Sequence, residues 1–216
     1  LASSAASDVY KRQSHLGGIA FDGENVWICH SNSNTLERIS YEYITKIAQD
    51  APEYCIDASA LSDEYRLKNT PSCITCYGGR LWVATHTSFF DSEMYSYSYD
   101  KKEDKLTAVS NYNLPSKVQG VAFDDNGSIY LSTSYGRNNS SYLKVYSSLL
   151  SLDKKPNEPK VKVEMPPCSE EVAIADGTVF VLFESASAKY FEGTDGMGKS
   201  PAPIDKLLEV SVASIW

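Results

Sequence analysis

The chain has 216 residues, of which 42% are hydrophobic and 22% are charged, a balance typical of a folded globular protein. Its net charge of -8 and pI near 4.9 argue against a nucleic-acid-binding surface, because phosphate binding needs clustered Lys and Arg. No apolar run approaches the roughly 20 residues that span a bilayer. We therefore expect one folded domain with no nucleic-acid partner and no transmembrane segment.

Residues 1–13 differ in composition from the rest of the chain and lack hydrophobic periodicity. They resemble translated adapter sequence at the ends of gene fragments, so we interpret them as a non-native N-terminal extension. A single domain is then predicted over residues 14–216, with the native N-terminus and any export signal expected upstream.

Four copies of a three-stranded antiparallel unit follow, with β-branched and aromatic residues in the strands and Asp, Asn and Gly in the turns. The clearest copy has predicted strands at 118–123, 129–134 and 142–146. Alignment of the second strands places an aromatic residue in the same position of every unit: Trp27, Trp82, Tyr130 and Phe180. Their spacings of 55, 48 and 50 residues indicate the blades of a propeller.

The predicted fold class is therefore all-β, a β-propeller with four recognisable blades. The blades are expected at about 14–58, 70–113, 117–165 and 168–216. Fourth strands are predicted at 53–58, 106–112 and 161–164, and the polar stretch 59–69 is predicted as a helical turn or surface loop. The last unit has no residues left for a fourth strand. We therefore expect the chain to be part of a five- or six-bladed propeller, since an open arc exposes a sheet edge.

Five cysteines are an odd number, so they cannot all pair within this chain. Cys73 and Cys76 have CxxC spacing, but side chains three apart in a strand point to opposite faces. Buried thiols in a sheet are thus favoured over a zinc or redox site. The redox state of the cysteines stays open.

Blade geometry brings polar residues together, because the first strand of a blade starts at the face where the second strand ends. All three histidines, several carboxylates and the loops after the second strands are expected at this one face, which is the predicted ligand-binding site. Its candidate residues are His15, Ser72, Gln119, Glu170, Glu171, His30, His86, Arg137 and Glu184.

The neutral candidates have structural alternatives. His15 and Gln119 could hydrogen-bond the backbone of neighbouring blades. His30 and His86 could be solvated residues at the outer part of the face.

The charged candidates also have alternatives. Successive strand residues point in opposite directions, so one of Glu170 and Glu171 can face the channel while the other packs toward a blade. Glu184 could simply end its strand, and Arg137 could hold a carboxylate or cap the carbonyls of its own loop.

Motifs of catalysis are missing from the sequence. It contains no Gly-x-Ser-x-Gly, no His-Glu-x-x-His, no phosphate-binding glycine loop and no EF-hand pattern. We therefore assign no catalytic residue.

Residues 15–31 (HLGGIAFDGENVWICHS) and 118–135 (VQGVAFDDNGSIYLSTSY) resemble blades of the propeller group that includes NHL-repeat proteins and the gluconolactonase-like (SMP-30) lactonases. The third and fourth units, with STSYGRNNSSYL and FESASAKY, are similar to secreted bacterial propeller proteins of unassigned activity. This resemblance implies a bacterial protein that is extracellular or on the cell surface.

The resemblance also implies a position for a metal ion. The lactonases hold a divalent ion at the channel mouth through Glu, Asn and Asp side chains, whereas the matching strand starts here offer His15 or Gly17, Ser72, Gln119 and Glu170. Calcium prefers six to eight oxygen ligands, several of them charged.

We expect a non-catalytic propeller that binds a small molecule, a glycan or a protein at this face and needs no cofactor. The alternative is a lactonase-like, metal-dependent hydrolase in which Glu170, with Gln119 or His15, holds a divalent ion. A structural interaction platform is a third hypothesis.

Overall fold

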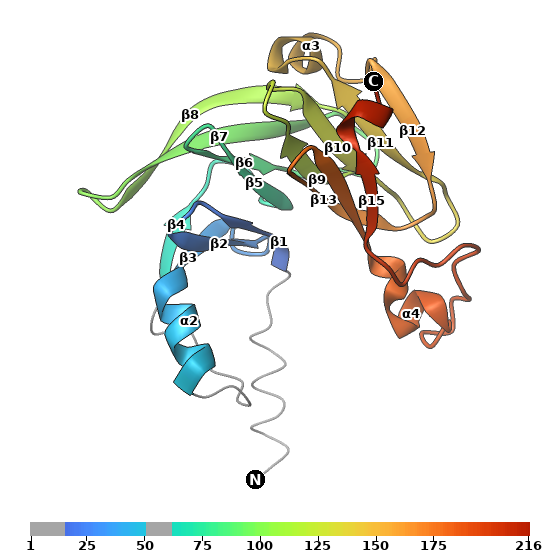
Figure 1. Cartoon of the computed structure of the whole chain (residues 1–216), viewed down its shortest axis with the longest axis horizontal. Coiled ribbons are helices and arrows are strands. Elements are labelled where there is room, and N and C mark those ends of the chain that lie inside the picture. Colours follow the sequence, from blue (N-terminus) through green and yellow to red (C-terminus); the bar gives the residue numbers. More distant parts are fainter. Residues whose placement is uncertain (1–15, 51–61) are drawn as a thin grey trace.

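The computed structural model describes residues 16–50 and 62–216, and its strands form four separate antiparallel sheets. The sheets follow one another in chain order around an arc, and the first strands β1, β5, β9 and β13 lie side by side along its inner side (Figure 1). This radial arrangement is that of a β-propeller with four blades, which confirms the predicted fold.

The first two blades each contain four strands in sequential order. Blade 1 consists of β1 (Leu16–Phe21), β2 (Asn25–His30), β3 (Thr35–Ser40) and β4 (Asp63–Arg66), with helix α2 (Tyr41–Asp50) after β3. Blade 2 consists of β5 (Cys73–Tyr77), β6 (Arg80–Ala84), β7 (Ser92–Asp100) and β8 (Lys105–Leu114).

The last two blades differ in their number of strands. Blade 3 consists of β9 (Val118–Phe123), β10 (Ile129–Thr133), β11 (Ser141–Tyr146) and β12 (Val161–Met165), with α3 (Leu149–Lys154) before β12. Blade 4 has three strands among the described residues: β13 (Ser169–Ala175), β14 (Thr178–Phe183) and β15 (Leu208–Ser211). Its short helices are η1 (Glu184–Ala186), α4 (Ala188–Phe191) and η2 (Val212–Ser214).

Blade 1 corrects one sequence prediction. The predicted fourth strand at 53–58 lies outside the described residues, and β4 forms instead within the stretch predicted as a turn or loop. The strand forms here because the side chains of Tyr65 and Leu67 are both buried in the cluster between blades 1 and 2. Burial of two alternate side chains outweighs the polar character of their neighbours.

A repeated aspartate fixes the turn between the first two strands of a blade. Asp124 accepts backbone hydrogen bonds from Asn126 (3.0 Å) and Ser128 (2.8 Å), and the hydroxyl of Tyr130 donates to it over 3.2 Å. In blade 1, Asp22 accepts from the indole Nε1 of Trp27 over 2.7 Å. The recurring aromatic residue is thus tied by its polar group to its own turn.

The same aromatic residue fills the space between blades. Trp27 packs in the cluster shared with blade 2, Trp82 in that with blade 3, and Tyr130 in that with blade 4. All three are at most 5% exposed, and burying such a side chain stabilises the fold by roughly 1.5–3 kcal/mol. Phe180, the fourth copy, is only partly buried.

The inner strands approach so closely that glycine is needed. A Cβ atom on Gly120 would lie 2.6 Å from both the backbone nitrogen of Val172 and the Oε1 atom of Glu171. The neighbouring inner strands β9 and β13 therefore pack backbone against backbone at this point.

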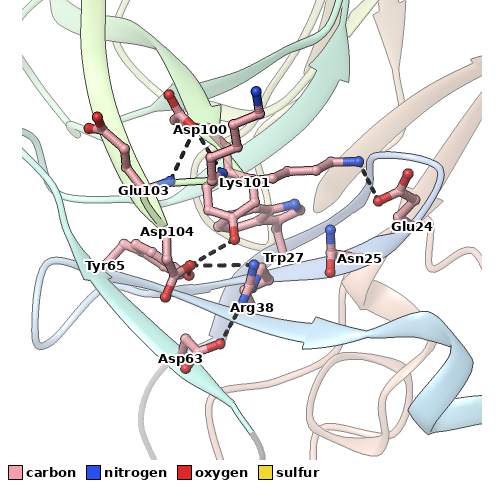
Figure 2. Close-up of polar contacts among 12 residues, drawn as sticks. Glu24, Asn25, Trp27, Arg38, Asp63, Tyr65, Asp100, Lys101, Glu103 and Asp104 are labelled. Carbon is pink, nitrogen blue, oxygen red and sulfur yellow. Dashed lines mark hydrogen bonds and ion pairs between the residues drawn. The ribbon is translucent and has the colours of Figure 1, made fainter.

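A polar cluster joins the outer ends of blades 1 and 2 (Figure 2). Arg38 forms ion pairs with Asp63 and with Asp104, whose Oδ1 atom also accepts the hydroxyls of Tyr65 and Tyr99. The Arg38 guanidinium lies 4.8 Å from the centre of the Tyr99 ring, so charge and ring stacking act together across the two blades.

The positions of Cys73 and Cys76 agree with the alternation expected of a strand. Cys73 packs between blades 2 and 3 and Cys76 between blades 1 and 2, so the CxxC pair points to opposite faces of its strand. Cys55 lies outside the described residues. Within the described part of the chain, no helix has the length and apolar character needed to cross a membrane.

Candidate functional site

The candidate site lies where the inner strands of blades 3 and 4 begin. Gln119 is the second residue of β9, Glu170 the second residue of β13, and Glu184 begins η1 directly after β14. Because β13 and β14 are antiparallel, the start of one and the end of the other share a face. We call the group of Gln119, Glu170, Glu184, Lys189 and Tyr190 the mouth cluster.

Two carboxyl groups share a hydrogen bond at the centre of the mouth cluster. Glu170 hydrogen-bonds Glu184, and Gln119 Nε2 donates to Glu170 Oε1 over 3.3 Å. Burial, followed by the charge of Glu184, raises the pKa of Glu170 to about 8. Two adjacent half-buried carboxylates repel one another, so near neutral pH this pair holds one proton between them.

Lys189 and Tyr190 extend the cluster from α4. The Tyr190 hydroxyl is hydrogen-bonded to both Glu184 and Lys189, and burial raises its pKa. The Lys189 ammonium lies 4.5 Å from the centre of the Tyr190 ring. One cation therefore stands beside the carboxyl pair.

Glu171 points away from this pair and serves the packing between blades. Its carboxylate accepts hydrogen bonds from the backbone nitrogens of Val172 and Val121. These bonds lower the pKa of Glu171, but by less than burial raises it. Burial raises its pKa to about 8. Glu170 and Glu171 thus take the two opposite directions that alternation in a strand requires.

Arg137 connects the loops of blades 3 and 4. Its guanidinium binds Asp195 through two nitrogens, over 2.6 and 3.1 Å, and donates to the carbonyls of Lys189 and Gly198. It also lies 4.9 Å from the centre of the Tyr190 ring. The guanidinium holds the pKa of Asp195 at about 2, and its donors are directed to the protein itself.

The remaining predicted site residues do not join the carboxyl pair. His30 Nε2 lies 2.6 Å from Glu37 on the adjacent strand of its own blade. His86 Nδ1 lies 3.1 Å from the carbonyl oxygen of Val118, which fixes the loop after β6 to the start of β9. Ser72 donates its backbone N–H to the carbonyl of Ala84. His15 lies outside the described residues.

Exposed aromatic side chains stand on the same face. Phe89 and Phe90, in the loop after β6, are 76% and 80% exposed. The ring of Phe89 meets that of Tyr135 edge to face, with their centres 5.8 Å apart. Aromatic rings that remain exposed beside half-buried polar groups are typical of recognition surfaces.

Three members of the arrangement were missed as site residues by sequence reasoning: Lys189, Tyr190 and Asp195. The length of their loop could have pointed to these residues, because the connection between β14 and β15 is longer than the corresponding loops of blades 1 to 3. The sequence predicts this loop at the correct face, but it does not show which residues of the loop reach the start of the blade.

The described residues at the mouth do not fit the divalent ion of the lactonase alternative. Among residues 16–50 and 62–216, no group of three or more His, Cys, Asp or Glu side chains is placed to hold a metal ion. In this part of the chain two carboxyl groups meet at the mouth, and they are already joined to one another.

A cavity of about 200 Å³ lies elsewhere, between blades 1 and 2, beside the turns that follow β1 and β5 and the end of β7. Its two acidic side chains are already engaged: Asp22 accepts from Trp27, and Glu24 pairs with Lys101. We therefore place the candidate site at the mouth cluster, whose carboxyl pair can accept a further partner.

Comparisons with known proteins do not place the chain in a family. No family model matches the sequence, and no match was found among curated proteins. Of the solved structures, hydrazine synthase of Kuenenia stuttgartiensis is similar with 10% identity and a TM-score of 0.48, over 76% of this chain and 42% of that chain. A nidogen/laminin complex (11%, TM-score 0.49) matches over 92% of this chain and 60% of that chain. A streptogramin B lyase (13% identity, TM-score 0.45) matches over 80% of this chain and 49% of that chain.

The chain spans less than two thirds of the length of each of these structures. At such identities and TM-scores, no activity is carried over to this chain.

Proposed function

We propose that this protein is a non-catalytic ligand-binding propeller that receives a positively charged group at its mouth cluster. The observation that carries the proposal is the hydrogen-bonded pair of Glu170 and Glu184, held half-buried at the start of the inner strand of blade 4. A fold of this kind supports a binding or scaffold role in general, and the choice of ligand is the proposal.

The charge balance favours a cation. The Arg137 guanidinium is neutralised by Asp195, so among the described residues Lys189 is the basic group left to face the two carboxyls. An incoming ammonium group would bring the charge that lets both carboxylates ionise, and the shared proton would leave. Gln119 and Tyr190 supply neutral hydrogen-bonding groups beside it.

The exposed rings suit the apolar part of the same ligand. Phe89, Phe90 and Tyr135 stand on loops at this face, and aromatic rings attract both apolar groups and cations. A small organic amine is thus favoured over a neutral polyol or an anion.

Calorimetric titration with benzylamine and with benzyl alcohol tests this choice, because the two probes differ only in the charged group. Benzylamine should bind and benzyl alcohol should not. Binding should strengthen about tenfold per pH unit up to pH 8, where the shared proton no longer has to be displaced. The Glu170→Gln variant should lose binding, and the exposed Glu103→Gln variant should keep it.

Equal binding of the two probes would contradict the proposal. A calcium titration belongs in the same series, because calcium binding that depends on Glu170 would favour the metal-dependent hydrolase instead.

A further inference from the structure

Three lysine side chains of blade 3 lie near one another on the side of the blade turned toward blade 2. Tyr146 of β11 packs in the cluster between these two blades, and Lys144 shares its orientation because it stands two residues earlier in the same strand. Lys162 of β12 is paired directly with Lys144. Lys117 directly precedes β9, and its charge also acts on Lys144. We call Lys117, Lys144 and Lys162 the lysine cluster.

The lysine cluster lies inside the arc. Blades 2 and 3 each have a described blade on both sides, so the cluster belongs to neither end face (Figure 1).

The direct pairing of two lysines is unfavourable within the chain itself. Side chains opposite one another on antiparallel strands have Cβ atoms about 4.5–5.5 Å apart, and like charges at such positions are destabilising. Lys144 is also half-buried, and burial, followed by the charges of Lys162 and Lys117, lowers its pKa. The fold thus holds three cations where their mutual repulsion weakens blade 3.

Carboxylates of the protein do not neutralise the lysine cluster. Among the described residues, none of its three ammonium groups forms an ion pair. Asp91 attracts Lys144, but more weakly than either lysine repels it, and its Oδ1 atom accepts from Asn157 over 3.0 Å. Glu164 of β12 accepts the hydroxyl of Ser140 over 2.6 Å. In a chain with a net charge of -8, this concentration of positive charge is a local exception.

Aromatic rings and backbone hydrogen bonds hold the lysines in position. The Lys162 ammonium lies 3.8 Å from the centre of the Tyr142 ring, and that of Lys117 lies 5.2 Å from the centre of the Tyr135 ring. The backbone nitrogen of Lys117 donates to the carbonyl of Thr87 over 2.7 Å, which ties this residue to blade 2. Rings position a cation without removing its charge, so the cluster remains able to pair with an anion.

We infer that the lysine cluster is a second binding site, which takes a phosphate monoester. A phosphate group of this kind carries a charge of about −1.5 to −2 at pH 7 and three acceptor oxygens, so it can pair with more than one ammonium group at once. A carboxylate carries one charge and matches three cations less well. The inference does not rest on the proposed function, since the mouth cluster and the lysine cluster accept groups of opposite charge.

Calorimetric titration at constant ionic strength with phenyl phosphate, benzoate and phenol tests the charge that the site requires. Phenyl phosphate should bind more tightly than benzoate, and phenol should not bind. Lys144→Gln and Lys162→Gln should each weaken the binding of phenyl phosphate about tenfold, because a hydrogen bond between charged groups is lost. Lys105→Gln removes the same charge from an exposed position of β8 and should leave the affinity unchanged.

Urea unfolding separates a ligand site from a structural cluster. In phosphate-free buffer, Lys162→Gln should be at least as stable as the wild type, because the substitution removes the repulsion from Lys144. Phenyl phosphate should raise the urea midpoint of the wild type and have much less effect on that of the variant. A purely structural role would instead make the variant less stable with and without the ligand, and this result would contradict the inference.

Two further probes distinguish the source of the phosphate group. Glycerol phosphate is a free monoester, and vesicles of phosphatidylcholine with phosphatidic acid present the same group on a lipid surface. Binding of glycerol phosphate that is weakened by Lys144→Gln supports a soluble ligand. Binding to the vesicles alone, weakened by the same substitution, supports a lipid headgroup.

Several results would overturn the inference. They are a wild type that does not bind phenyl phosphate, an equal loss of affinity in Lys105→Gln, and binding that persists in both cluster variants, which would indicate an adventitious ion only. Should the variants fail to fold, carbon NMR of the lysine Cε atoms in the wild type still gives an answer. Phenyl phosphate should raise the pKa of Lys144, and an unchanged pKa would contradict the inference.

Discussion

Gln119 of β9 donates a hydrogen bond to Glu170 of β13 over 3.3 Å and thereby joins the inner strands of two neighbouring blades at the mouth of the propeller. The partners are 51 residues apart in the chain, and each is the second residue of its inner strand. The bond also orients Glu170, whose carboxyl group meets Glu184.

Replacing Glu184 by Gln should lower the pKa of Glu170 from about 8. The charge of Glu184 is one cause of the shift, but burial is the larger cause, so the pKa should stay above the ordinary value. Carbon-detected NMR titration of the glutamate carboxyls measures the change. Glu103→Gln, far from the mouth, serves as the control, and an unchanged Glu170 titration would show that the two carboxyls do not interact.

Stability should fall as the pH rises from about 4.5 to about 8. Glu170 and Glu171 have pKa values of about 8 in the folded chain against 4.5 for an ordinary glutamate, so the folded state retains protons that the unfolded state loses in this window. Their contribution is complete below pH 4.5 and lost above pH 8. The lowered pKa of Asp195 acts with the opposite sign, but only at more acidic pH.

Urea unfolding followed by tryptophan fluorescence at several pH values measures this slope. Glu171→Gln should flatten it, because the amide does not titrate. If the stability of the Glu171→Gln variant changed with pH as steeply as that of the wild type, other groups would be responsible for the pH dependence.

Gly120→Ala should destabilise the protein by about 1–3 kcal/mol, the usual cost of inserting an atom into a well-packed site. The new Cβ would lie 2.6 Å from the backbone nitrogen of Val172, and backbone cannot move aside as a flexible side chain can. Chemical denaturation gives the difference. Thr107→Ala, at an exposed position of β8, should change the stability little, and a similar loss in both variants would argue against the close approach.

Asp104→Ala should loosen the outer contact between blades 1 and 2 and cost about 1–2 kcal/mol, because both tyrosine hydroxyls lose their acceptor and Arg38 loses one of its two ion pairs (Figure 2). Hydrogen exchange should rise in β3 and β4. The neighbouring Glu103→Ala is the matched control. Unchanged exchange in blade 1 would mean that the aromatic packing alone holds the two blades together.

Strand positions could be predicted because their information is local. The predicted strands of the third unit agree with β9, β10 and β11 to within one residue, since alternation and turn residues mark each boundary. The strand β4 was missed because the buried Tyr65 is surrounded by charged residues. The helix α2 was also missed, although Ser40 directly before it accepts a hydrogen bond from the backbone N–H of Tyr43.

The candidate site was only partly predictable. Gln119, Glu170 and Glu184 were found because the blade geometry places strand starts and strand ends at one face. Lys189 and Asp195 were not, because their positions depend on how a long loop folds back over the mouth.

The sequence by itself thus determined the repeat, the turns and the identity of the aromatic residues between blades, since each depends on neighbours within one unit. The tertiary structure alone decided which carboxyl groups share a proton and that Asp195 neutralises Arg137. These partners are up to 58 positions apart in the chain, and only the packing of one blade on the next, with the loop after β14, brings such residues together.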